Sequence, residues 1–142
     1  MELSARNVFQ GTVKELKAGI VTTEVVLSLP GENDIIATIT NESVHHLGLA
    51  PGKEASALIK APLVIIVAGE PSMRFSTRNM IKGTISRIEP GAVNAEVIVD
   101  ISAGHSICAV ITMGSVKSMG LKVGDSVTAL FKASSVILAT RI

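Results

Sequence analysis

The sequence predicts an all-β protein built from two tandem copies of one small domain. Its 142 residues are 47% hydrophobic but only 2% aromatic, so the core must consist of aliphatic side chains, many of them β-branched. Short apolar runs alternate with Gly and Pro turns, as in a chain of short strands. The sequence also aligns with itself at an offset of 72 residues, which indicates a duplication.

The two copies begin with the same polar motif. The offset pairs residues 4–68 with residues 76–140 without a gap, and roughly a third of the pairs are identical. Each copy opens with Ser-x-Arg-Asn and a later Gly-Thr, as SARNVFQGTV and as STRNMIKGTI. We expect a first domain at residues 1–69, a linker at residues 70–75 and a second domain at residues 76–142. Domains this small should pack together or oligomerise.

Five strands and one helix are expected in each copy. In the first copy, turn residues separate strand-like runs at residues 7–16, 21–29, 34–40, 54–60 and 63–68. A short helix should lie between the third and fourth strands, because Thr40 or Asn41 can cap it and Gly48 can close it in the left-handed conformation. In the second copy this helix should start less well, because Gly114 replaces Glu42. Five short strands with one helix fit a small closed barrel of the OB type better than a sandwich.

Composition excludes several function classes. The net charge is +1, from 13 basic and 12 acidic residues without blocks, so no nucleic-acid or membrane partner is expected. An OB-fold nucleic-acid-binding module is the alternative, but it would need a basic groove and stacking aromatics, and the chain has three Phe and no Trp or Tyr. There is no nucleophile with a paired base and no Gly-rich phosphate loop. We therefore expect no enzyme and no catalytic cofactor.

The residues that commonly bind metal cations do not form a motif. Cys108 has no second cysteine and is interpreted as a small buried hydrophobe. His45 and His46 point in different directions on the expected helix and are interpreted as solvated surface, and His105 has no visible partner. No metal cation site is therefore expected. With no secretory signal and no apolar run near the roughly 20 residues of a membrane span, we expect a cytoplasmic protein.

The repeated polar residues are hydrogen-bond donors suited to an oxyanion. Alternation along an extended segment places the Ser4 hydroxyl and the Arg6 guanidinium on one side. Lys60 ends a strand just before Ala61, and Thr40 adds a hydroxyl. Converging hydroxyl, guanidinium and ammonium donors can hold a small tetrahedral dianion. The structural alternative is that Ser and Asn cap a turn while Arg covers the barrel surface.

The motifs resemble a known domain. SARNVFQGTV, AGIVTTEVVLSL, ITNESVHHLGLAPG and ALIKAPLVI resemble a Mop (molybdate-binding) domain, and STRNMIKGTI, PGAVNAEVIVDI, VITMGSVKSMGL and ALFKASSVIL resemble a second one. Together they cover nearly the whole chain, as in the two-domain molbindins. The resemblance implies OB-like barrels, a homotrimer, and reversible binding of molybdate and tungstate for intracellular molybdenum storage. It leaves open which anion is preferred and whether the role is store, buffer or donor.

The resemblance also implies which residues bind. The main molybdate sites would use the following residues: Ser4, Arg6, Thr40, Lys60, Ala61, Ser76, Arg78, Thr112, Lys132, Ala133 and Ser134. Pro62 replaces Ser134 in the first copy and has no N–H, so unequal affinities are expected. Axial sites near a threefold axis would use Gly19, Val21, Thr22, Gly91, Val93 and Asn94; alternatively, the glycines only make turns. Whether each copy completes its own site or its neighbour's stays open.

Overall fold

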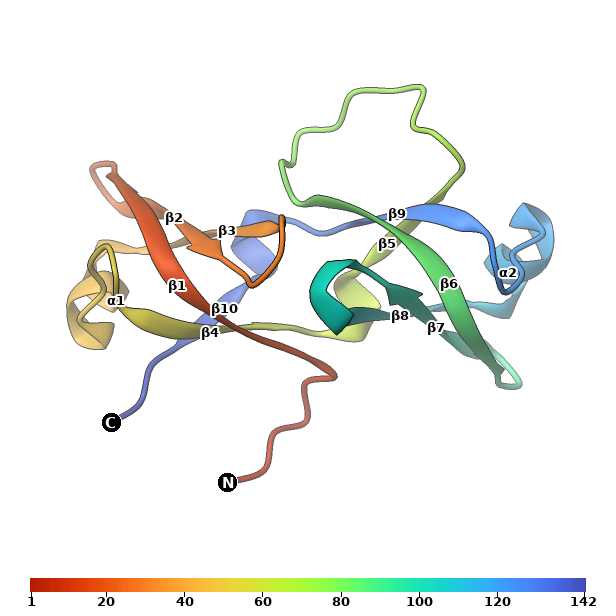
Figure 1. Ribbon diagram of the computed structural model, residues 1–142, viewed down its shortest axis with the longest axis horizontal. Helices are drawn as coiled ribbons and strands as arrows, with labels where there is room; N and C mark the ends of the chain where they lie inside the picture. The colour runs from red at the N-terminus through yellow and green to blue at the C-terminus, as the bar shows by residue number, and fades with distance from the viewer.

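The computed structural model describes residues 1–142 and contains two five-stranded antiparallel sheets with two short α-helices (Figure 1). The expected mostly-β fold in two tandem units is confirmed. Both α-helices are seven residues long, and none of the helices could cross a membrane. The first repeat contains β1 (Asn7–Ala18), β2 (Thr22–Ser28), β3 (Asp34–Thr40), α1 (Asn41–Leu47), β4 (Glu54–Ile59), the 3-10 turn η1 (Ala61–Leu63) and β5 (Ile65–Ala68).

The second repeat follows the same order with one added 3-10 turn. It contains β6 (Met80–Pro90), β7 (Asn94–Asp100), η2 (Ser102–Gly104), β8 (Ser106–Thr112), α2 (Met113–Met119), β9 (Ser126–Leu130), η3 (Ala133–Ser135) and β10 (Ile137–Ala139). Gly114 does not shorten the second helix, contrary to the expected weaker start. The hydroxyl of Thr112 accepts a hydrogen bond from the Ser115 N–H, and the helix keeps the same length as α1.

The last strand of each repeat belongs to the sheet of the other repeat. The first sheet has the order β10-β4-β1-β2-β3, and the second has the order β5-β9-β6-β7-β8. In Figure 1 the blue β10 lies beside β4, and the yellow-green β5 lies beside β9. The chain therefore passes between sheets at η1 and again at η3, whereas residues 69–79 connect two strands of one sheet. The boundaries of the repeats and those of the sheets are not the same.

A close approach between strands explains the glycine of each Gly-Thr pair. A Cβ added at Gly11 would lie 2.5 Å from the carbonyl oxygen of Ser28 on β2, and the same clash would occur between Gly83 and Asp100 on β7. The register then shifts by one residue between Val13 and Glu15, and at the equivalent place in β6. This bulge bends both long strands, as barrel closure requires.

One continuous hydrophobic core joins the two sheets. Its 27 buried residues are almost all aliphatic, as expected, and come from both repeats. Phe9 and Phe131 are buried in this core, whereas Phe75 lies exposed in the connection before β6. Because apolar side chains from both sheets share one core, the two repeats form one packed unit.

Candidate functional site: a hydroxyl-lined groove where the repeats exchange residues

The Asn of each Ser-x-Arg-Asn motif attaches its own repeat to the other repeat. Asn7 is 2% exposed; its amide donates to the carbonyl of Cys108 and accepts from the N–H of Cys108, both at 2.8 Å. Asn79 is fully buried and makes the same two bonds with Ile36, at 2.7 and 2.8 Å. The residues bound by these two amides lie on edge strands: Cys108 on β8 and Ile36 on β3. Each amide thus pairs a strand edge that would otherwise stay open.

The arginine next to each Asn pairs with a carboxylate of the other repeat. Arg6 Nη1 donates to Glu96 Oε1 at 2.6 Å, and Arg78 Nη2 donates to Glu24 Oε1. The two glutamates therefore have specific partners in the other repeat. The hydrogen bond to Glu96, with electrostatic contributions from Cys108 and Glu96, raises the pKa of Arg6 above its ordinary value. The guanidinium of Arg6 is a permanent cation, and about half of the Arg6 side chain is exposed to solvent.

The two Lys-Ala pairs lie where the chain passes between sheets. Lys60 precedes η1 and Lys132 precedes η3; both lysines are exposed. η1 packs against β8, and η3 packs against β3. Because β3 and β8 end at Thr40 and Thr112, the Lys-Ala of each repeat lies against the strand that carries the other repeat's threonine.

Each threonine is hydrogen-bonded to a neighbouring serine that sequence reasoning missed. Thr40 Oγ1 accepts from the N–H of Ser43 at 3.1 Å and donates to Ser43 Oγ at 2.8 Å. Thr112 and Ser115 make the same pair of bonds. The threonine proton is used inside the cap, so the serine hydroxyl is the donor left for a ligand. Ser43 and Ser115 are identical across the 72-residue offset, a signal that could have identified them.

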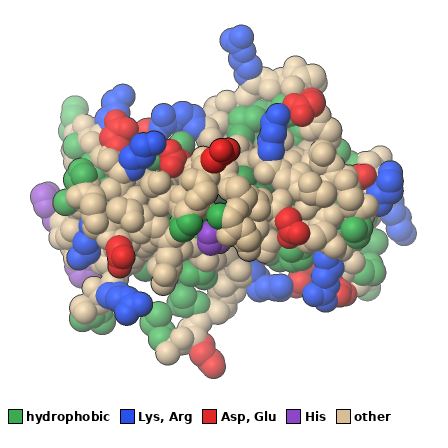
Figure 2. Space-filling view, in the orientation of Figure 1, with side chains coloured by type: hydrophobic (Ala, Val, Ile, Leu, Met, Phe, Trp, Pro, Cys, Tyr) green, Lys and Arg blue, Asp and Glu red, His purple; other side chains and the backbone are tan.

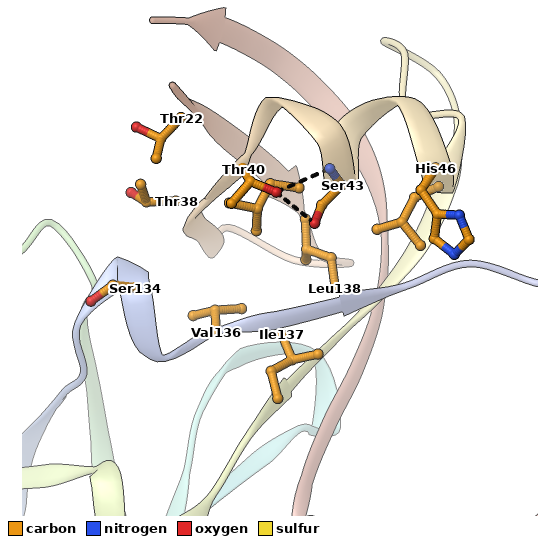
Figure 3. Close-up of a pocket in the computed structure, with 11 residues that line it drawn as sticks. Thr22, Thr38, Thr40, Ser43, His46, Ser134, Val136, Ile137 and Leu138 are labelled. Carbon is orange, nitrogen blue, oxygen red and sulfur yellow. Dashed lines mark hydrogen bonds between the residues drawn. The ribbon is translucent and has the colours of Figure 1, made fainter. Parts of the chain in front are cut away.

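A groove of about 530 Å³ lies between β3, α1 and the segment that contains η3 and β10. Figure 3 shows Thr22, Thr38 and Ser134 at one end, the Thr40 cap above, and His46 at the other end. Three predicted residues, Thr22, Thr40 and Ser134, therefore come together from both repeats. The groove is lined by Thr22, Thr38, Ile39, Thr40, Ser43, His46, Leu47, Ser134, Val136, Ile137 and Leu138.

The positive charges of the second repeat lie next to this groove. Glu24 is directly opposite Thr38 in the register of β2 and β3, so its partner Arg78 lies beside the hydroxyl end. Lys132 and Ala133 immediately precede Ser134 on the groove wall. The second sheet has the equivalent arrangement: Arg6 pairs with Glu96 on β7, and Lys60 and Ala61 belong to the segment that packs against β8. Ser4 and Ser76 are exposed two residues before the arginines.

The predicted axial residues form tight turns. The N–H of Gly19 donates to the Thr22 carbonyl at 2.8 Å, and a Cβ at Gly19 would lie 2.9 Å from the same oxygen. The carbonyl of Val21 accepts from Asn41 at 2.9 Å. In the second repeat, Gly91, Val93 and Asn94 form an equivalent turn, whose Val93 carbonyl accepts from Met113. The turn geometry alone accounts for both glycines.

The remaining titratable residues do not gather. Nowhere in the chain do three His, Cys, Asp or Glu side chains come close enough to hold a metal ion. His45 and His46 are exposed, and His105 packs edge-on against Phe9 with ring centroids 6.1 Å apart. Burial raises the pKa of the Cys108 thiol, and the charge of Arg6 partly opposes this shift. On the face seen in Figure 2, acidic and basic side chains are interspersed rather than separated into patches.

Known proteins share this architecture. A crystal structure of the cytoplasmic molybdate-binding protein ModG with molybdate bound matches with a TM-score of 0.95 and 45% identity, covering 99% of this chain and 100% of that one. The molybdenum transport protein ModE of Azotobacter vinelandii is 44% identical over 98% of this chain and 51% of its own length. The molybdenum-pterin-binding protein MopA of Rhodobacter capsulatus is 44% identical over 98% of this chain and 52% of its own length.

A DNA-binding transcriptional dual regulator, ModE of Escherichia coli strain K12, is 38% identical over 99% of this chain and 53% of its own length. The chain thus spans about half the length of the curated relatives it matches. The TOBE domain model matches twice, at residues 3–66 and 76–138. The chain therefore belongs to the TOBE domain family, as a tandem pair of Mop-type domains.

Proposed function

We propose that this protein binds molybdate reversibly, without chemically changing it, and serves intracellular molybdenum storage. The observation that carries the proposal is the convergence of donors from both repeats. Ser134 of the second repeat lines one groove with Thr22, Thr40 and Ser43 of the first, and Arg78 pairs with Glu24, which lies opposite Thr38 of that groove. The similarity to ModG, a structure that contains molybdate, supports the same ligand class.

Each main site takes donors from both repeats. The first site contains Ser76, Arg78, Lys132, Ala133 and Ser134 with Thr40; the second contains Ser4, Arg6, Lys60 and Ala61 with Thr112. This assignment follows from the crossing of the chain at η1 and η3 and from the pairing of each arginine with the other repeat. Guanidinium, ammonium and hydroxyl groups supply charge-assisted hydrogen bonds to a dianion. The axial residues supply main-chain groups for further sites near a symmetry axis.

We also propose a homotrimer. Each sheet carries an apolar row across three strands: Val8, Leu58 and Ile137 lie opposite one another in the first sheet, as do Met80, the buried Leu130 and Ile65 in the second. Val8, Ile137, Met80 and Ile65 are exposed in the single chain. Exposed apolar rows of this kind favour self-association. The number three comes from the resemblance to two-domain molbindins; light scattering that gives a monomer would contradict it.

Equilibrium dialysis tests the proposed ligand. Purified protein is dialysed against molybdate, tungstate or sulfate, and the bound anion is counted per chain. We expect molybdate and tungstate to bind well above sulfate, because a rigid donor set discriminates by anion size. Arg6→Ala combined with Arg78→Ala should lower molybdate stoichiometry, because each site loses its guanidinium. Arg74→Ala, which removes an exposed arginine from the connection before β6, is the matched control. Equal binding of sulfate and molybdate would refute the proposal.

The storage role needs a separate measurement. Cells that lack the protein should retain less molybdenum after transfer to molybdate-free medium than cells that contain it. Some relatives are regulators that include a similar pair of domains within a longer chain. Unchanged retention together with altered molybdate-dependent transcription would favour a sensing role instead.

A further inference from the structure

We propose that Glu24 and Glu96 are affinity-determining residues, each a built-in carboxylate that competes with the oxyanion for the arginine of its site. The inference rests on the proposed function, because it assigns Arg6 and Arg78 to the ligand. Glu96 accepts from Arg6 Nη1 at 2.6 Å, and Glu24 accepts from Arg78 Nη2. A carboxylate and a tetrahedral oxyanion use the same guanidinium donors.

The geometry of both pairs is built into the fold. Each arginine directly precedes a buried Asn whose amide makes two hydrogen bonds to the facing edge strand. This attachment fixes the backbone of Arg6 beside β8 and that of Arg78 beside β3, and each arginine side chain reaches the glutamate on the next strand, β7 or β2. Each glutamate projects from an interior strand, β2 or β7, that has a hydrogen-bonded neighbour on either side. The same pair therefore occurs twice, at positions related by the 72-residue offset.

The carboxylate also repels the ligand. Glu24 lies directly opposite Thr38, which lines the groove, so its charge is close to any dianion held there. Both glutamates are more than one-third exposed, and water screens but does not remove this repulsion. The consequence for a storage protein is weaker binding, which allows release when the free anion becomes scarce.

Neutralising both glutamates tests the competition. Glu24→Gln with Glu96→Gln keeps the size of each side chain and an amide oxygen that still accepts from arginine. Molybdate affinity should rise about threefold to tenfold, the effect of removing one unit charge near a half-exposed site. Sulfate, also a dianion, should gain by the same factor. A monoanion should gain by roughly the square root of that factor, because its Coulomb energy with the carboxylate is half as large.

Two further variants make the result specific. Glu70→Gln removes one negative charge and one ion pair, the one with Lys82 on β6, and it should leave affinity unchanged. Glu24→Asp with Glu96→Asp keeps the charge but withdraws each carboxylate by one methylene, so a smaller rise is expected. The thermal midpoint of each variant verifies folding.

The outcomes separate this inference from the proposed function. If the wild-type protein fails to bind molybdate, the proposed function itself is lost. If the wild type binds and the double Gln variant binds equally or more weakly, the competition is refuted and the glutamates serve to hold the arginines in place. A gain that is the same for mono- and dianions would also refute a charge-based competitor.

Discussion

The two proposed ligand surfaces of the molecule follow one plan but differ in lining. The groove of the first sheet presents hydroxyls at Thr38 and Ser134, whereas Val110 and Pro62 occupy the equivalent positions beside the second sheet. Pro62 supplies neither a hydroxyl nor an N–H. Both sides therefore have the same arginine and lysine, but the first sheet's groove has the more polar lining. We expect the groove of the first sheet to be the tighter oxyanion site.

The charges around the two arginines are arranged differently but balance to the same total. Glu24, the partner of Arg78, lies opposite Lys17 on the neighbouring strand, whereas Glu96, the partner of Arg6, lies opposite Glu89. Glu89 is compensated by a hydrogen bond from Arg87, at 2.9 Å. In β1, Glu15 occupies the position that Arg87 occupies in β6, so each long strand brings one acidic and one basic residue, and the net charge from this strand is the same at both sites.

Separating the repeats should have the largest effect. A fragment of residues 1–69 keeps β1 to β4 but loses β10, so the edge of β4 opens and β5 has no partner strand. We expect no folded monomer, but either an unfolded chain or a dimer that exchanges β5. The fragment of residues 76–142 should behave alike, and mixing the two should restore the native fold. Sedimentation and circular dichroism measure this; a folded monomer of either fragment would show that the repeats are independent.

Removing the buried amides should have the next largest effect and should distinguish the two repeats. Asn7→Ala leaves the N–H and carbonyl of Cys108 unpaired, at a cost of about 2 to 5 kcal/mol. Asn79→Ala should cost less, because Ile36 is only partly buried and water can replace the amide. Urea denaturation of both variants gives the two free energies of unfolding, with the exposed Asn94→Ala as control. The opposite order would contradict this account.

Single-site variants should reveal the inequality of the two surfaces. Arg6→Ala leaves the Arg78 site intact and should retain the tighter molybdate binding, whereas Arg78→Ala should retain the weaker. Thr38→Val should reduce affinity at the first groove by about threefold to tenfold, the loss of one hydrogen bond, and Val110→Thr should raise affinity at the other surface. Calorimetric titration of each variant measures the affinities. Equal affinities in the two arginine variants would mean that the lining does not matter.

The smallest expected effect concerns Cys108, whose backbone carbonyl and N–H pair with the side-chain amide of Asn7. Burial raises the pKa of the Cys108 thiol above 9.0, its ordinary value. The native state therefore keeps a proton that the unfolded chain releases, so the free energy of unfolding should fall as pH rises from that value through the folded pKa. Cys108→Val should lose this slope. Denaturation midpoints at pH 8 to 10 test the expectation, and an unchanged slope in the variant would contradict it.

Much of the fold could be predicted from local sequence signals. Strand β3 was expected at residues 34–40 and is found there, and Thr40 and Gly48 begin and end helix α1 as expected, the glycine at φ 64°. The fifth strand was expected from residue 63 but begins at Ile65, because the chain first makes a 3-10 turn. The repeated polar residues pointed to Thr40 and Ser134, which line one groove, but they did not indicate the ion pairs of Glu24 and Glu96 or the hydrogen bond between Thr40 and Ser43.

The sequence by itself determined the duplication, the β class, the aliphatic core and the kinds of donor available, because periodicity, composition and repetition are properties of residue order. Only the tertiary structure decided which repeat supplies each strand and each donor. β5 and β10 are short apolar strands of four and three residues, and their own residues do not specify whether β4 or β9 is the partner. The direction of the chain at η1 and η3 and the amides of Asn7 and Asn79 make this choice, and they bring the donors of one repeat to the hydroxyls of the other.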